Sequence, residues 1–248
     1  DRTQSASEYT LGRIAFARGD YTLALRYFDR ILQKDRKNVT ALRAAAYTLI
    51  RLERFTDAEA YYGRLLELVP ESADSGYSYA VVLMAIKEPA RAEEVLNGYA
   101  EMLAGNREAE LLLARARRDQ GKVEAIEDYR RYLAAGDDSR VRLEYAGVLE
   151  AGEFYARALE EYRLLLQEAA AGSSRAGVSA AELRYAVGRL LLIADNAEEG
   201  IAEIEGAVAD GFTGDGEMEA LLQSGRVPPA HRESLRRIIE EVASAKQP

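Results

Sequence analysis

Few residues of this chain are of the types that carry out covalent or metal chemistry. His231 is the only histidine, and it follows Pro228 and Pro229 near the start of the last helical segment. A general base needs a cleft and a partner that orients it, so this isolated histidine indicates a solvated side chain rather than a catalytic one. The chain has no cysteine, which excludes disulfides, thiolate zinc sites and cysteine nucleophiles.

The acidic, glycine-rich segment 210–217, DGFTGDGE, is the best candidate for a cation site. A calcium-binding EF-hand loop needs oxygen ligands at alternate positions, and here Phe212 and Gly214 occupy two of them. We therefore expect a loop without a metal. The sequence contains no GxxxxGK[ST], GxGxxG, GxSxG or HExxH motif. These observations predict a non-enzymatic protein with no cofactor and no metal.

Arginine and tyrosine are abundant instead, and their side chains are suited to binding a partner. Lysine is rare, so 28 of the 33 basic residues are arginine, and the chain also has 15 tyrosines. Arginine forms paired hydrogen bonds to carboxylates and stacks on aromatic rings. A biased genomic base composition would produce the same excess, so composition alone leaves both explanations open. The net charge of −9 disfavours nucleic acid as a partner, because a surface that binds nucleic acid must be basic.

These residues are carried by a sequence that repeats about every 34 positions. One column holds small residues: Gly12, Ala46, Ala80 and Ala114. A second column is alanine throughout: Ala24, Ala58, Ala92, Ala125 and Ala158. Its first three members are 34 positions apart, and each of the last two steps is 33 positions. A third column holds large side chains: Phe28, Tyr62, Leu96, Tyr129 and Tyr162. A period near 34 is typical of stacked helical hairpins, each of which contacts only its neighbours.

Each period divides into two helical segments. In the first period, 5–38, Gly19 can adopt the positive φ that ends a helix, and helical spacing predicts a second helix over Tyr21–Lys34. Pro70 ends the second period, since proline cannot continue a helix. Pro89 begins the second helix of the third period, where its missing N–H has no intrahelical partner to lose.

This pattern resembles the tetratricopeptide-repeat family. The family's unit has a large apolar–small pair in its first helix, then glycine, an aromatic residue and alanine around the turn. An aromatic residue, a further core residue and a late proline follow. The matching residues of the first two periods are Leu11, Gly12, Gly19, Tyr21, Ala24, Phe28, Ile31, Ala46, Phe55, Ala58, Tyr62, Leu65 and Pro70. The tryptophan of the family's first helix is absent, because the chain has no Trp.

The resemblance implies an all-α fold, a right-handed superhelical solenoid of stacked antiparallel helix hairpins. We expect three well-matched hairpins over 5–106 and three divergent hairpins over 107–214, with an insertion near 168–180. A C-terminal helical cap is expected over 215–248, because a solenoid end exposes apolar surface. The apolar residues of that cap recur at helical spacing: Leu235, Ile238, Ile239 and Val242.

In this family the first helix of each hairpin lines a concave face, which implies a partner-binding groove. Projection of the helical period places tyrosines, arginines and apolar residues there: Tyr9, Arg13, Phe16, Arg43, Tyr47, Arg51, Tyr77, Met84, Arg115, Arg118, Arg140, Tyr185 and Arg189. Tyrosine and arginine dominate the energetics of many interfaces, so we predict an acidic peptide or protein as partner. The alternative is that the tyrosines fill gaps between helices and the arginines pair with nearby glutamates.

The leading hypothesis is thus a protein-binding scaffold, and others stay open. Chaperone-tail-binding members of the family clamp a carboxylate with Lys and Asn, but Arg13 and Tyr47 occupy the matching asparagine positions, so that role is not expected. A self-assembling structural solenoid is one alternative, with a homo-oligomer. A periplasmic or lipoprotein subunit of the bacterial envelope, for membrane or cell-wall assembly or transport, is another. A helical-repeat enzyme or small-ligand carrier lacks any catalytic constellation.

Two features of the sequence bear on the compartment. No apolar run approaches the 18 residues of a transmembrane helix. The chain begins at Asp1 rather than Met, from which we expect a trimmed form whose gene encodes an upstream segment. The envelope is therefore favoured over the cytoplasm.

Overall fold

The structure, a computed structural model, describes residues 2–172, 175–194 and 196–245. Within these ranges every regular element is a helix, fourteen α-helices and one short 3-10 helix. The chain divides into two compact units, an N-terminal unit over Asp1–Asp128 and a C-terminal unit over Tyr129–Pro248. The predicted all-α solenoid of stacked hairpins is confirmed.

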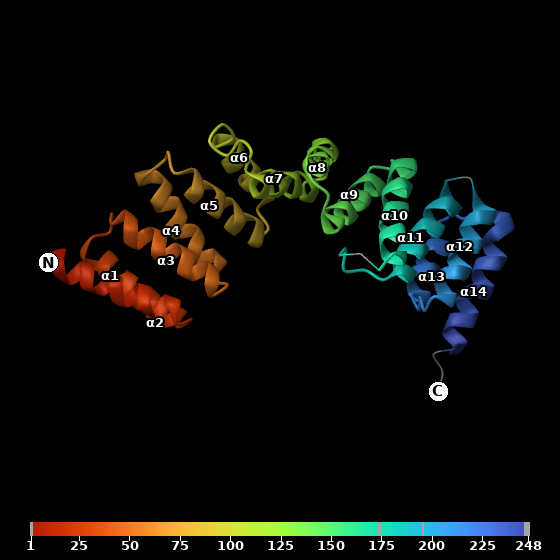
Figure 1. Ribbon diagram of the computed structural model, residues 1–248, viewed down its shortest axis with the longest axis horizontal. Coiled ribbons are helices and arrows are strands. Elements are labelled where there is room, and N and C mark those ends of the chain that lie inside the picture. Colours follow the sequence, from red (N-terminus) through yellow and green to blue (C-terminus); the bar gives the residue numbers. More distant parts are fainter. Residues whose placement is uncertain (1, 173–174, 195, 246–248) are drawn as a thin grey trace. The chain divides into compact units, whose positions relative to one another are not determined.

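The N-terminal unit is a stack of helical hairpins (Figure 1). Its helices are α1 (Arg2–Ala17), α2 (Tyr21–Lys34), α3 (Val39–Arg51), α4 (Phe55–Leu68), α5 (Ala73–Ala85), α6 (Pro89–Gly98), α7 (Arg107–Asp119) and the first residues of α8 (Glu124–Ala135). Each helix packs on the next one in the chain, from α1 on α2 to α6 on α7. The first helices of successive hairpins also touch, α3 on α5 and α5 on α7.

The turns within hairpins share one backbone feature, a residue with positive φ after the first helix. Gly19 has this conformation with φ 80°, and Gly121 has it with φ 69°. The second and third hairpins use Glu53 and Lys87 instead, with φ 56° and 65°. Asp20 then caps α2, because its side chain accepts a hydrogen bond from the Leu23 N–H at 3.0 Å.

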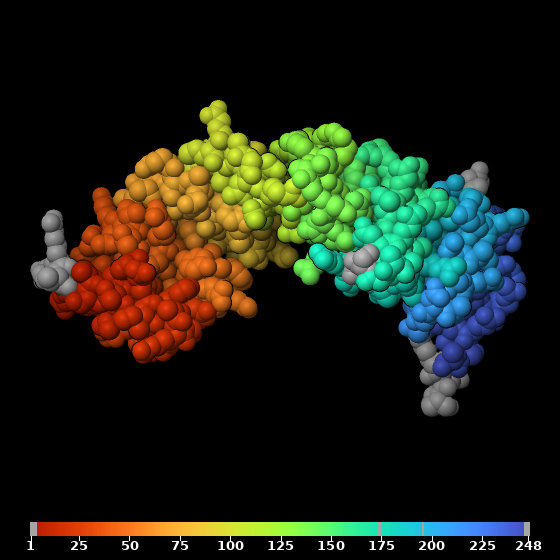
Figure 2. All heavy atoms as spheres, in the orientation of Figure 1, coloured from red at the N-terminus to blue at the C-terminus, as the bar shows by residue number. Residues whose placement is uncertain are grey.

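The repeat columns form the core of the N-terminal unit. Ala24 and Ala58 are fully buried, and so are the rings of Phe28 and Tyr62 that follow them by one turn. Small residues let the two helices of a hairpin approach closely, and the rings fill the space between hairpins. Successive hairpins form a continuous surface within the unit, in chain order (Figure 2).

The C-terminal unit continues the hairpin pattern and ends in a helical cap. Its helices after α8 are α9 (Ser139–Ala151), α10 (Tyr155–Ala170), α11 (Ala180–Ile193), α12 (Ala197–Ala209), α13 (Asp215–Gln223), the 3-10 helix η1 (Pro229–His231) and α14 (Arg232–Ala245). α11 begins with a capping box, in which Ser179 and Glu182 satisfy each other's backbone N–H groups. The apolar stripe of α14 is buried, as predicted for the cap: Leu235, Ile238, Ile239 and Val242.

Two elements end or begin inside segments for which the sequence predicted an insertion or a loop. α10 is longer than the second helices of the earlier hairpins and ends at Ala170, so the first residues of the predicted insertion 168–180 are helical. The connection to α11 begins after Ala170. Residues 173 and 174 of the predicted insertion lie outside the described residues. α13 begins at Asp215, inside the segment 210–217 for which the sequence predicted a loop. Asp215 and Glu217 both lie in its first turn, where carboxylates favour the positive end of the helix dipole.

Candidate partner-binding site

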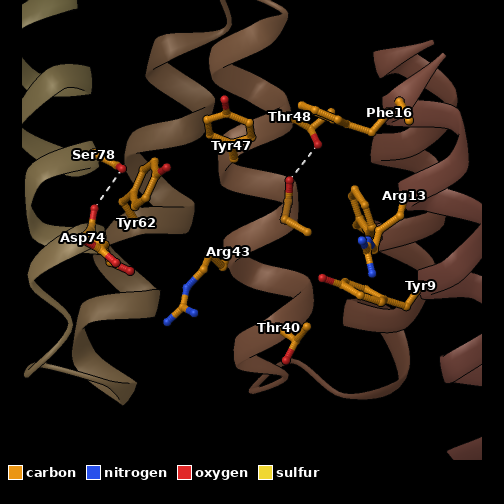
Figure 3. Close-up of a pocket in the computed structure, with 14 residues that line it drawn as sticks. Tyr9, Arg13, Phe16, Thr40, Arg43, Tyr47, Thr48, Tyr62, Asp74 and Ser78 are labelled. Atoms are coloured by element: carbon orange, nitrogen blue, oxygen red, sulfur yellow. Dashed lines mark hydrogen bonds between the residues drawn. The ribbon is translucent and has the colours of Figure 1, made fainter. Parts of the chain in front are cut away.

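A pocket of about 510 Å³ opens between the first helices of the N-terminal unit. α1, α3 and α5 supply most of its lining, and one ring each comes from α2 and α4. The lining residues are Tyr9, Arg13, Phe16, Ala17, Phe28, Thr40, Arg43, Ala44, Tyr47, Thr48, Tyr62, Asp74, Ser75 and Ser78 (Figure 3). The pocket therefore brings together five of the thirteen predicted groove residues: Tyr9, Arg13, Phe16, Arg43 and Tyr47.

Helical spacing places these side chains on a common face. Arg13 and Phe16 lie three positions apart on α1, and Arg43 and Tyr47 lie four apart on α3, so each pair stacks along one side of its helix. In Figure 3, Tyr9, Arg13 and Phe16 project from α1 toward α3, and the Arg43 side chain extends into the space between α3 and α5.

Aromatic rings form the apolar part of the pocket. Phe16 lies with its ring centroid 5.5 Å from that of Tyr47 and 5.0 Å from that of Tyr21. Tyr47 remains 49% exposed, which is high for a ring that already has an aromatic neighbour. Burial raises the pKa of Tyr62 at the base of the pocket, so this phenol stays neutral over the physiological range.

Two arginines reach the pocket without a partner. Within the described residues, the side chains of Arg13 and Arg43 make no hydrogen bond and no ion pair, and both are exposed. Asp74 also lines the pocket, but no ion pair joins it to either arginine. The pocket thus combines two guanidinium groups, one carboxylate and an apolar ring surface.

Short hydroxyl side chains complete the lining. The Thr48 hydroxyl donates to the Ala44 carbonyl at 2.6 Å, and the Ser78 hydroxyl donates to the Asp74 carbonyl at 2.9 Å (Figure 3). Thr40 and Ser78 did not figure in the sequence-based groove. Helical spacing could have found both, since Thr40 precedes Arg43 by one turn and Ser78 follows Asp74 by one turn.

The other predicted groove residues of this unit lie outside the pocket. Arg51 is bound to a residue of the first hairpin: its Nη2 donates to the Tyr21 hydroxyl at 3.0 Å, and its guanidinium lies over the Tyr21 ring. Tyr77 and Met84 are half-buried on α5, and Arg115 and Arg118 are half-buried on α7. Burial raises the pKa of Tyr77, and the nearby charges of Glu108 and Arg115 act on it in opposite directions.

The three predicted groove residues of the C-terminal unit have different surroundings. Arg140 is exposed and its Nε donates to the Arg175 carbonyl at 3.3 Å. Tyr185 is only 4% exposed and stacks on Phe212 with ring centroids 4.2 Å apart. Arg189 is held by Glu150, with Nη2 donating to Oε2 at 2.8 Å and Nη1 donating to Oε1.

Tyr185 and Arg189 therefore differ from the expectation for exposed groove residues. The segment between α12 and α13 places Phe212 over α11 and covers Tyr185. Glu150 comes from α9, 39 positions before Arg189. Both side chains contribute to the packing of the C-terminal unit.

The described residues offer no arrangement for a metal and no membrane span. Among them, no group of three or more His, Asp or Glu side chains could hold a metal ion. None of the helices in the described ranges is both long enough and apolar enough to cross a membrane.

Comparison with known families finds a match over part of the N-terminal unit. The sequence model described as "Tetratricopeptide repeat" matches residues 15–73 and 49–116. No curated protein matches the chain.

Several solved structures share the fold. A MamA protein is 19% identical with a TM-score of 0.62, over 66% of this chain and 90% of that one. YrrB, titled a TPR protein with an unusual peptide-binding site, is 16% identical with a TM-score of 0.58, over 73% of this chain and 91% of that one. PilW, titled a widely conserved type IV pilus biogenesis factor, is 19% identical with a TM-score of 0.57, over 82% of this chain and 92% of that one.

At these identities the likeness concerns the fold. The repeat columns, the stacked hairpins and the sequence match over residues 15–116 agree with one another. Residues 15–116 of this chain are tetratricopeptide repeats.

Proposed function

We propose that this chain is a non-enzymatic scaffold that binds a protein or peptide carrying acidic groups, and that the pocket between α1, α3 and α5 is the centre of the binding site. The observation that carries the proposal is the pair Arg13 and Arg43. Both line the pocket, and neither has an ion pair or hydrogen bond within the described residues.

Other arginines of the same unit have carboxylate partners. Arg54 pairs with Asp57 at 2.6 Å and Arg91 with Glu59 at 2.7 Å. Arg117 pairs with Glu93 at 3.0 Å and with Asp128 at 2.8 Å. A partner's carboxylate would give Arg13 and Arg43 the charge-assisted hydrogen bonds that these arginines already make.

The rings beside the two arginines would hold an apolar side chain of the same partner. Phe16 and the half-exposed Tyr47 form a surface of aromatic carbon next to the guanidinium groups. Aromatic and arginine side chains at the centre of an interface supply most of its binding energy. The preferred ligand is therefore an acidic side chain followed or preceded by a large apolar one.

Further predicted groove residues would extend this surface along the first helices. Tyr77 and Met84 on α5 and Arg115 and Arg118 on α7 continue the groove within the N-terminal unit under this proposal. In the C-terminal unit, Arg140 is the member with an exposed guanidinium.

A paired peptide array tests the proposal. Peptides that carry Asp or Glu next to Leu or Phe are compared with the same peptides carrying Asn or Gln. We expect the wild type to prefer the acidic members. The variant Arg13→Gln/Arg43→Gln should bind them about 100-fold more weakly, because each charge-assisted hydrogen bond is worth about 1.5–3 kcal/mol.

Arg26→Gln/Arg36→Gln is the matched control, since both arginines are exposed in the same unit and neither lines the pocket. Adding Arg115→Gln to the pocket variant tests whether the groove continues to α7. Equal binding of acidic and amide peptides, or unchanged binding by Arg13→Gln/Arg43→Gln, would contradict the proposal.

A second proposal concerns the place of action. We propose a role as an assembly factor of the bacterial envelope, on the basis of the fold likeness to PilW and the match of 82% of this chain to 92% of that one. The test is fractionation of the source organism with an antibody to this chain. Recovery in the periplasmic or membrane fraction is expected, and recovery with cytoplasmic markers alone would overturn the proposal.

A further inference from the structure

The C-terminal unit has a pocket of its own, of about 660 Å³, which α11 and α13 line. α11 supplies Tyr185 and Arg189, which lie one helical turn apart on the same face. α13 supplies Glu217 from its first turn and Leu221 one turn later. The pocket therefore combines polar and apolar side chains of two helices, all within one unit.

This pocket has the same place in its hairpin as the pocket of the N-terminal unit. On α1, Tyr9 lies three positions before a glycine and Arg13 directly follows that glycine. On α11, Tyr185 and Arg189 have the same spacing around Gly188. Both pairs line a pocket, so the charges around each pair decide what the two pockets can bind.

The two arginines of the C-terminal pocket already have partners. Both Nη atoms of Arg189 donate to the carboxylate of Glu150. Arg226 donates to the Tyr155 hydroxyl at 2.9 Å, and its Nη2 lies 3.7 Å from Oε1 of Glu153. Unlike the arginines of the N-terminal pocket, these two are not available to an acidic ligand.

One carboxylate of the pocket lacks a partner. Among the described residues, the exposed side chain of Glu217 makes no hydrogen bond and no ion pair. The other carboxylate in the lining, Glu182, accepts hydrogen bonds from the N–H and the hydroxyl of Ser179 in the capping box of α11. The uncompensated charge of the pocket is therefore negative, opposite in sign to that of the N-terminal pocket.

The Tyr185 hydroxyl is a second group of this pocket that lacks a partner. It is buried, and no described residue forms a hydrogen bond with it. Burial raises its pKa, and the charges of Arg189 and Glu217 act on that pKa in opposite directions, so the hydroxyl end of the ring lies among the polar groups of the pocket. A buried hydroxyl without a partner costs stability, and a bound ligand can supply the missing hydrogen bond.

Tyrosine hydroxyls elsewhere in this chain accept hydrogen bonds from arginine. The pairs, with distances of 2.5–3.0 Å, are Arg51 with Tyr21, Arg91 with Tyr79, Arg157 with Tyr145 and Arg226 with Tyr155. A guanidinium has five N–H donors in one plane, so it can bind a phenol and a carboxylate at once. Arg91 does this, because it also pairs with Glu59 at 2.7 Å.

We propose that the pocket between α11 and α13 binds an arginine side chain of a protein partner, with the guanidinium donating to the Glu217 carboxylate and to the Tyr185 hydroxyl. These are the two kinds of acceptor that Arg91 has within the chain. The proposal shares with the scaffold function only the premise that the partner is a protein, since it concerns another pocket and a ligand of opposite charge.

The apolar side chains of the pocket suit the rest of such a ligand. Leu221 and Phe212 both line it, and they would contact the methylene groups of the bound arginine or a neighbouring apolar side chain. Arginine commonly packs these methylene groups on apolar surface while its charged end binds polar groups. The preferred ligand is therefore an arginine next to a residue such as leucine.

Labelled peptides that carry arginine beside leucine test the proposal on the full chain. They are compared with the same peptides carrying citrulline, which keeps the shape of arginine without its charge, or lysine, which has a charge but no planar group. Fluorescence anisotropy measures the dissociation constants. We expect the wild type to bind the arginine peptides about tenfold more tightly than either alternative, because only arginine offers charged donors to two acceptors.

Two variants and a matched control locate the binding site. Glu217→Gln should bind arginine and citrulline peptides equally. Glu219→Gln should keep the preference for arginine, because Glu219 is exposed on the same helix but does not line the pocket. Tyr185→Phe should bind the arginine peptides several-fold more weakly without a loss of stability in thermal unfolding, a combination that a role in packing alone would not produce.

Three results would overturn the proposal. The first is equal binding of arginine and citrulline or lysine peptides by the wild type. The second is a Glu217→Gln variant that keeps the wild-type preference. The third is a Glu219→Gln variant that loses as much preference as Glu217→Gln, which would assign the preference to the net charge of the chain.

The same proteins separate this site from the one in the N-terminal unit. Arg13→Gln/Arg43→Gln is expected to bind the arginine peptides like the wild type. Glu217→Gln is expected to bind the acidic peptides like the wild type. Failure of one proposal would therefore leave the measurement for the other intact.

Discussion

Gly12 and the ring of Phe28 are in direct contact across the first hairpin. A Cβ on Gly12 would lie 2.5 Å from Cε1 of Phe28. The ring is 2% exposed and is flanked by Tyr9 at a centroid distance of 5.7 Å, so it has little room to withdraw. This contact sets how closely α1 approaches α2, and α1 carries four residues of the candidate pocket.

Gly12→Ala is therefore expected to destabilise the chain, although alanine favours helix more than glycine does. The new methyl group overpacks the hairpin, and such strain costs about 1–3 kcal/mol, more than the gain of about 1 kcal/mol in helix propensity. Urea unfolding measures the difference. Gly63→Ala on α4 is the control, because a Cβ there would meet no described atom within 4 Å beyond its chain neighbours and the backbone of its own helix; it should be neutral or stabilising. A Gly12→Ala variant as stable as Gly63→Ala would refute the packing argument.

Tyr185→Phe should leave the chain as stable or make it more stable by about 1 kcal/mol, because a buried hydroxyl without a partner carries an uncompensated desolvation penalty. The Tyr185 hydroxyl is buried and finds no hydrogen-bond partner among the residues that the structure describes. Burial raises its pKa to about 12, so the phenol is neutral at any pH used in the measurement. Thermal unfolding provides the comparison, and Tyr145→Phe, which loses the bond from Arg157, is the control. A clear loss of stability in Tyr185→Phe would show that the hydroxyl has a partner.

Glu150 and Arg189 should be coupled. Glu150→Gln leaves the guanidinium, which lies in a partly buried site, without its counter-charge. We expect a loss of about 1–3 kcal/mol, less than for a fully buried pair because both side chains are partly exposed. Arg189→Met in the Glu150→Gln background should recover part of that loss. Additive effects in the double-mutant cycle would exclude the coupling.

Stability should also fall at low pH through Glu93. Burial opposes ionisation of Glu93, but hydrogen bonds from Lys122, Arg117 and Gln120 outweigh it and hold the pKa at about 2. A carboxyl with a depressed native pKa stabilises the fold fully above its unfolded pKa of about 4.3, and this contribution disappears as the pH falls through the native value.

The difference in stability between the wild type and Glu93→Gln should therefore be constant above about pH 5 and shrink between about pH 4.3 and 2. Guanidinium unfolding at several pH values measures it. Glu94→Gln, the exposed neighbour, controls for general charge effects. A difference that is unchanged at pH 2 would contradict the assigned pKa.

Local patterns account for much of the fold. The predicted second helix, Tyr21–Lys34, coincides with α2, because Asp20 caps its start and the repeat columns define its buried face. The small residues at the predicted close contacts are buried, as Ala46 and Ala80 show. Both are consequences of residues a few positions apart, which helical periodicity describes well.

The candidate site depends on contacts between residues that are far apart in the sequence, and helical periodicity predicts fewer of these contacts. It groups Tyr9, Arg13 and Phe16 on one face of α1, and the pocket contains all three. It also groups Tyr185 with Arg189, but it cannot know that Phe212 covers the first and Glu150 pairs with the second. A helical projection tells which side chains share a face, whereas what lies against that face depends on segments far away in the chain.

The burial of one side of α14 also bears on how such a stack of hairpins can change in length. A further hairpin packed on the outer side of α14 would meet exposed charged side chains, Arg236 and Glu240, rather than apolar ones. Lengthening the stack on that side therefore requires that α14 be displaced or that its outer side become apolar.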